Sequence, residues 1–138
     1  MDRPLAQPGL YAMKMDGHPV LLGQICAACG HVSFPRQDFG CEKCGAYGEM
    51  LQKKELEAEG ILRSFAEVHL HSGKGIEAPF TIGEVALADG PLVRATMLLH
   101  EGEAPVIGRP VSGKLCPQQD AQGEEELELR FEMKGERA

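Results

Sequence analysis

The second half of the chain alternates apolar and polar positions with a period of two. In the segment 61–71 the even positions from Leu62 to Leu70 would share one face, which predicts a half-buried strand. Further strands are predicted at 80–88, 92–99, 110–115 and 126–133, with turns such as Asp89-Gly90-Pro91 between them. Five short strands favour a small closed barrel of the OB type, because closure removes free sheet edges; an open sandwich is the alternative.

The first half of the chain has a less regular pattern. Pro4, Pro8 and Pro19 interrupt its start and predict an extended or weakly helical arm. An apolar run at 20–25 predicts a strand, and few large apolar residues follow it as far as Tyr47. We therefore expect three parts, namely an arm over 1–19, a small module over 20–57 and the barrel over 58–138.

The small module contains four of the five cysteines as two C-x-x-C pairs, each followed by a glycine and separated by eleven residues. Two such turns bring four sulfur atoms to one point, and four thiolates are the donor set of a closed, tetrahedral structural zinc site. A segment this small buries too little surface to fold alone, so a metal would supply the missing stability. The spacing predicts a rubredoxin-like zinc ribbon in which Zn²⁺ is bound by Cys26, Cys29, Cys41 and Cys44.

Two other uses of paired cysteines fit the sequence less well, and a third stays open. A disulfide framework would need an oxidising compartment, and Met1 leads into no apolar signal segment. A thioredoxin-like site has one C-x-x-C beside a βαβ unit, whereas this chain has two pairs and no such pattern. An iron site of the rubredoxin type uses the same four sulfurs, so zinc is favoured over iron without excluding it.

The charge of the chain bears on its partners. The formal net charge is −7, and residues 58–138 carry eight Lys/Arg against fourteen Asp/Glu. Zinc ribbons and OB barrels often bind nucleic acid, but that needs a basic face to displace counterions from phosphates. We therefore expect no nucleic acid. We also expect no membrane association and a cytoplasmic location, because no apolar run approaches the length that spans a bilayer.

Candidate catalytic groups are missing from the sequence pattern. The chain shows no Ser/His/Asp order, phosphate loop or dinucleotide fingerprint. Cys116, the fifth cysteine, lies between Leu115 and Pro117, and neither neighbour could activate it as a nucleophile. We expect Cys116 to be a packing residue and the chain to have no catalytic residues of its own.

The order of these parts resembles a known family, the acyl-CoA-associated zinc-ribbon plus OB-fold proteins (domain of unknown function 35). The resemblance covers about residues 20–133. It rests on Gly23, the two C-x-x-C-G motifs, Phe34-Pro35-Arg36, Gly60-Ile61-Leu62, Pro79-Phe80, Gly90-Pro91-Leu92 and Ile107-Gly108-Arg109-Pro110-Val111. The fold it implies is mostly β, with a rubredoxin-like zinc ribbon followed by a five-stranded OB-fold barrel.

The resemblance also implies a function. Members of this family look like small accessory subunits of thiolase-type enzymes, such as acetoacetyl-CoA thiolase or benzoylsuccinyl-CoA thiolase. A thiolase-fold partner would carry the nucleophilic cysteine in a hetero-oligomer, with acyl-CoA at or near the shared interface. Two alternatives stay open, a nucleic-acid-binding ribbon–barrel protein and a free-standing acyl-CoA-binding module.

Four residues are candidate contacts to the partner or to CoA. Phe34, Pro35 and Arg36 lie in the loop between the two cysteine pairs. A metal would make this loop rigid, and the Arg36 guanidinium could then bind a carboxylate or a phosphate. Lys74 lies between two glycines, where a lysine and backbone amides could approach a phosphate together.

Overall fold

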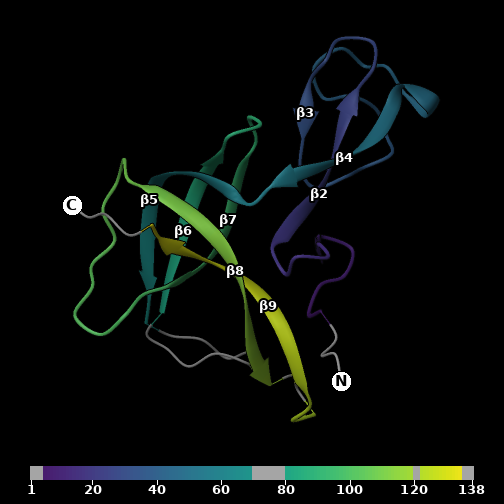
Figure 1. The fold of residues 1–138 in the computed structure, drawn as a ribbon. Coiled ribbons are helices and arrows are strands. Elements are labelled where there is room, and N and C mark those ends of the chain that lie inside the picture. Colours follow the sequence, from purple (N-terminus) through teal and green to yellow (C-terminus); the bar gives the residue numbers. More distant parts are fainter. Residues whose placement is uncertain (1–4, 70–79, 120–121, 135–138) are drawn as a thin grey trace.

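Two β-sheets make up the described part of the chain (Figure 1). A computed structural model describes residues 5–69, 80–119 and 122–134. Within these ranges no helix is long and apolar enough to cross a membrane. The elements are β1 (Tyr11–Met13), β2 (Pro19–Cys26), β3 (Val32–Ser33), the 3-10 helix η1 (Gly48–Met50), β4 (Leu51–Glu57), β5 (Glu59–Val68), β6 (Phe80–Leu87), β7 (Leu92–Leu98), β8 (Pro110–Gln119) and β9 (Glu125–Met133).

The first sheet is built around β2, and we refer to it as the ribbon sheet. Strand β4 pairs with β2 along its length, from Val20↔Glu57 to Cys26↔Leu51. Strands β1 and β3 pair with the two ends of β2, for example at Tyr11↔Leu21. The predicted strand at 20–25 is therefore the centre of this sheet, and the observed β2 ends at Cys26, the first cysteine of the metal centre.

The second sheet is a closed barrel with the strand order β5-β6-β7-β9-β8. Its neighbours pair antiparallel except β7 and β9, which run parallel and pair at two positions, Met97↔Phe131 and Leu98↔Glu132. Strands β5 and β8 close the barrel through Glu59, Gly60 and Ile61. The predicted fold class, a zinc ribbon followed by a five-stranded barrel of mostly β structure, is confirmed.

The ribbon sheet and the barrel share one hydrophobic core. Strand β4 runs almost directly into β5, with buried Ala58 between them (Figure 1). Tyr11 and Leu56 from the ribbon sheet belong to the same buried cluster as Val85 and Phe131 from the barrel. The zinc ribbon is thus held against the barrel by packing as well as by the chain connection. The boundaries expected at 19/20 and 57/58 stay predictions.

Two strand predictions were wrong, and the structure gives the reasons. The alternation expected along 61–71 holds at Leu62, which is fully buried, but the register shifts between Leu62 and Ser64. This bulge places one extra residue in β5, so Phe65 rather than Ser64 lies opposite inward-facing Gly83. Residues 63–67 are all exposed, so the predicted half-buried face ends at Leu62.

The second error concerns the end of β8. The strand predicted at 110–115 was expected to end before Cys116-Pro117, yet β8 continues to Gln119 and Pro117 pairs with Leu127. Among the described residues, β5 pairs with β8 only at Pro110, Val111 and Ser112. The second edge of β8 is therefore free at Pro117, where a proline costs no ladder hydrogen bond.

Candidate metal centre and the surfaces around it

The two cysteine pairs adopt the same local structure. In the first turn the Gly30 amide donates to the Cys26 carbonyl at 2.7 Å, and in the second the Gly45 amide donates to the Cys41 carbonyl at 2.9 Å. Both glycines have a φ of 83°. Only glycine adopts this conformation without steric cost, which explains the glycine after each pair.

The four sulfur atoms converge as a tetrahedral zinc site requires. All four Sγ atoms lie within 4.8 Å of one another. The Cys26–Cys44 separation is 3.6 Å and the Cys29–Cys41 separation is 3.7 Å. Four thiolates at a Zn–S distance of about 2.3 Å would have their sulfurs about 3.8 Å apart, whereas a disulfide needs about 2 Å. The four cysteines form a zinc-ribbon site, as predicted.

Backbone amides prepare one of these sulfurs to bind a cation. The amides of Cys44 and Lys43 donate to Sγ of Cys41 at 3.5 and 3.3 Å. These donors lower the pKa of the Cys41 thiol from 9.0 to about 6, because they stabilise the thiolate. A metal binds the thiolate form, which these two amides stabilise at Cys41.

A pair of side chains joins the two turns beside the sulfurs. Nε2 of His31, which follows the first turn, lies 2.6 Å from Oε2 of Glu42, which lies inside the second. With four sulfurs as donors, neither side chain is needed as a ligand. A site closed by four protein ligands leaves no position for a water molecule or a substrate, so its chemistry is structural.

The three candidate contact residues between the turns do not form one surface. Phe34 is half-buried and packs against the core, whereas Pro35 and Arg36 are exposed. Phe34 lines a cavity of about 290 Å³ together with Tyr11 and Phe131. This cavity lies where β7 and β9 separate, because those strands pair only near Met97 within the described residues. Lys74, the fourth candidate, lies outside the described residues.

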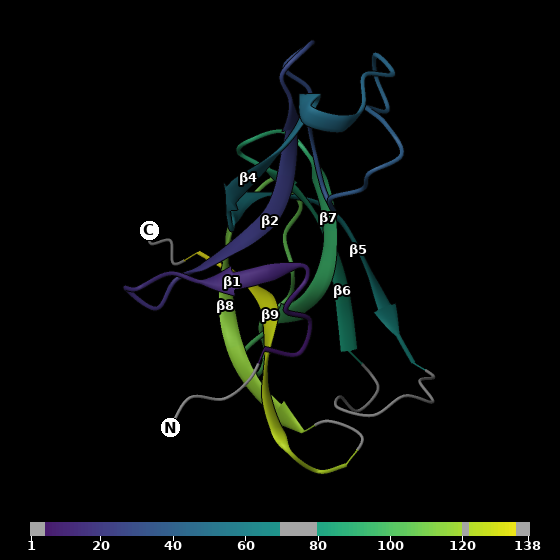
Figure 2. The same cartoon turned by 90° about the vertical axis from the view of Figure 1, so that its right-hand side faces the viewer.

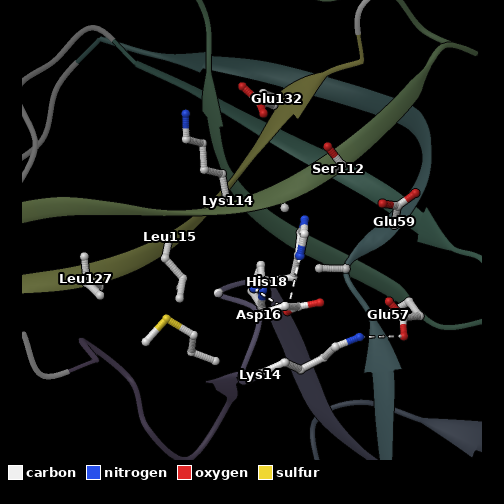
Figure 3. A pocket seen from close by; sticks show the side chains of 15 residues that line it. Lys14, Asp16, His18, Glu57, Glu59, Ser112, Lys114, Leu115, Leu127 and Glu132 are labelled. Atoms are coloured by element: carbon white, nitrogen blue, oxygen red, sulfur yellow. Dashed lines mark hydrogen bonds and ion pairs between the residues drawn. The ribbon is translucent and has the colours of Figure 1, made fainter. Parts of the chain in front are cut away.

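A larger, charged cavity lies at the joint between the ribbon sheet and the barrel (Figure 3). Its volume is about 660 Å³. Lys14 lies 3.5 Å from Glu57 across it, and Nδ1 of His18 lies 3.3 Å from Asp16. Both pairs are exposed to solvent.

Sequence reasoning missed residues that position the site. Gln24 is 2% exposed, and its Oε1 accepts from the amide of Gln37 at 3.3 Å. A polar residue inside an apolar strand segment was the available signal. Cys116 is buried, and burial raises the pKa of its thiol, which agrees with the expected packing role.

The fold and the site together define a zinc-ribbon protein with an OB-type barrel. The segment 16–47 matches the family of the ChsH2 rubredoxin-like zinc ribbon domain. This segment contains all four metal-binding cysteines. No curated protein sequence matches the chain.

A solved structure described as the Ltp2-ChsH2(DUF35) aldolase resembles the whole arrangement. It is 22% identical, superposes with a TM-score of 0.62, and the match covers 80% of this chain and 84% of the other. At this identity the match shows a shared fold. The two comparisons support the resemblance to the domain of unknown function 35 family that the sequence indicated.

Proposed function

We propose that this chain is a zinc-binding, non-catalytic accessory subunit of a thiolase-type acyl-CoA complex. The observation that carries the proposal is the closed four-sulfur site of a ChsH2-type ribbon, packed by a common core against a barrel. A site of this kind fixes shape and leaves the chemistry to another protein. The partner would be a thiolase-fold subunit whose own cysteine attacks the thioester.

The partner's reaction would make or break a carbon–carbon bond next to a thioester. The structural relative is described as an aldolase, and the candidate partners are thiolases of acetoacetyl-CoA or benzoylsuccinyl-CoA. In this proposal acyl-CoA lies at or near the subunit interface. We also propose that the complex is cytoplasmic.

Two residues of the ribbon loop would contact different chemical groups of the partner or of CoA. Phe34 faces the apolar cavity of about 290 Å³ between ribbon and barrel, which suits an apolar group. Exposed Arg36 suits a carboxylate or a phosphate, because its guanidinium can donate two parallel hydrogen bonds. Pro35 and Lys74 complete the set of proposed contacts to the partner or CoA.

Complex formation tests the proposal directly. The chain would be mixed with thiolase-fold proteins from the same genome, and size-exclusion chromatography with light scattering would measure the mass. We expect one of these proteins to elute with the chain as a hetero-oligomer of fixed stoichiometry. If every such protein elutes separately, and the isolated chain binds acyl-CoA esters by calorimetry, a free-standing acyl-CoA module replaces the accessory role.

A further inference from the structure

The end of the zinc ribbon exposes two aromatic side chains and a methionine. Phe39 is 81% exposed, Tyr47 is 75% exposed and Met50 is 43% exposed. We call these three residues the ribbon-tip patch. Single exposed apolar residues are common on protein surfaces, but several large ones together mark an interaction site.

Backbone hydrogen bonds bring the three residues of the patch onto adjoining segments. The Cys41 amide donates to the Ala46 carbonyl at 2.7 Å, which places the segment holding Phe39 beside the segment holding Tyr47. The Met50 amide donates to the Tyr47 carbonyl at 3.4 Å. The region around η1 lies at the end of the molecule opposite the β8–β9 turn (Figure 2), where a partner could approach it.

The loop that carries Phe39 is held in place by hydrogen bonds. The Gln37 side chain donates to the Gly40 carbonyl at 2.6 Å and accepts from the amides of Phe39 and Gly40 at 3.0 and 3.3 Å. The Gln37 amide in turn donates to buried Gln24. A loop fixed in this way loses little entropy on binding, so its exposed aromatic side chain is ready to serve as an anchor.

Charge decides which kind of partner fits the patch. Bases of nucleic acid stack on aromatic side chains, but the phosphates then need cations close by. Exposed Asp38, Glu42 and Glu49 lie around the patch together with exposed Arg36 and Lys43, so its surroundings are mixed in charge and present no basic face. Without a basic face the phosphates of a nucleic acid find no cluster of cations, so these surroundings favour a protein surface with apolar pockets and a polar rim.

We propose that the ribbon-tip patch docks on the catalytic partner subunit, with Phe39 and Tyr47 filling apolar pockets there. This inference rests on the proposed function, which supplies the partner. It adds that the metal centre fixes the docking face and that Gln37 is a positioning residue for Phe39. Aromatic side chains in such positions carry most of the binding energy of an interface.

A pair of double variants tests the proposal. Phe39→Ser with Tyr47→Ser removes the anchors, and Ile61→Ser with Leu92→Ser removes apolar side chains that are 40% and 51% exposed on the barrel. Affinity for the catalytic partner would be measured by biolayer interferometry, with zinc content and circular dichroism as checks of folding. We expect the ribbon-tip variant to bind about 100-fold more weakly and the barrel variant to bind like the wild type.

Several outcomes would overturn the proposal. Equal affinity of the ribbon-tip variant and the wild type would show that the patch lies outside the interface. Loss of self-association in the ribbon-tip variant would assign the patch to a second copy, and loss of binding to a single-stranded oligonucleotide would assign it to nucleic acid. If the wild type binds no catalytic partner at all, the proposed function fails first and the docking face with it.

Discussion

Single residues at the metal centre divide into ligands and supports. Cys26 and Cys41 are buried, whereas Cys29 and Cys44 are exposed, so two sulfurs face the interior and two face solvent. Of the two buried cysteines, Cys41 accepts at its Sγ from the amides of Lys43 and Cys44, and the Cys26 carbonyl accepts from the Gly30 amide. Removal of a buried thiolate should therefore disturb both metal binding and the local fold.

Replacement of one ligand measures this dependence. Cys26→Ser should lose the bound zinc and unfold the ribbon, because the remaining three thiolates no longer close the site. Cys116→Ser is the matched control, because Cys116 is also buried but does not belong to the cluster. Zinc content by mass spectrometry and near-ultraviolet circular dichroism would report the two effects.

The four-thiolate assignment would be contradicted by a Cys26→Ser protein that keeps one zinc per chain and still binds its partner. The same measurement on the wild type identifies the metal. Iron in place of zinc would give a coloured protein with the same four ligands.

Among the elements, the joint between β4 and β5 links metal centre and barrel. The barrel closes where β5 pairs with both neighbours, and Gly60 lies at this point, opposite Leu87 on β6 and Val111 on β8. A Cβ at Gly60 would collide with the carbonyl group of Ala86. The absence of a side chain is therefore required for close approach of the strands.

Gly60→Ala should destabilise the protein by about 2 kcal/mol, because the barrel must open slightly to admit the methyl group. Gly9→Ala is the control, because a Cβ at Gly9 meets nothing within 4 Å. Urea unfolding of the two variants would be compared with the wild type. Equal stability of Gly60→Ala and the wild type would show that β5 and β6 leave room for a methyl group at Gly60.

The elements also show what a sequence can predict. Strands with period-two alternation and turn residues at both ends, such as β6 and β7, were predicted nearly to the residue. Strand β4 was not predicted as a strand, because its sequence Leu51-Gln52-Lys53-Lys54-Glu55-Leu56-Glu57 lacks β-branched residues. Its seven pairs with β2 form because the ribbon brings the two strands together, which is a tertiary effect.

The residues of the candidate site likewise differ in whether the sequence could predict them. The cysteine spacing predicted the four ligands, because a short chain with paired thiols has few ways to use them. The ribbon-tip patch and the Gln24–Gln37 contact were not predicted, because exposure and direction of a loop depend on the folded structure. Phe34 and Arg36 are adjacent to Pro35 in sequence but differ in burial, which composition does not reveal.

At the scale of the whole molecule, the metal centre, the shared core and the ribbon-tip patch would together present one rigid surface to a partner. In the proposed account zinc would hold the ribbon loops, the core holds the ribbon against the barrel, and the fixed surface would contact a larger protein. The acidic balance of the chain, −7 overall, fits a protein partner with basic regions better than a nucleic acid. The central claim is that catalysis belongs to the partner and depends on this chain.

Turnover of a thiolase-fold partner, titrated with this chain, tests that claim most directly. Carbon–carbon bond cleavage of an acyl-CoA would be followed with the partner alone, with this chain alone and with both. The account predicts no turnover by this chain alone, and activity of the partner that rises and saturates at a fixed stoichiometry. Full turnover by the partner alone, unchanged when this chain is added, would contradict it.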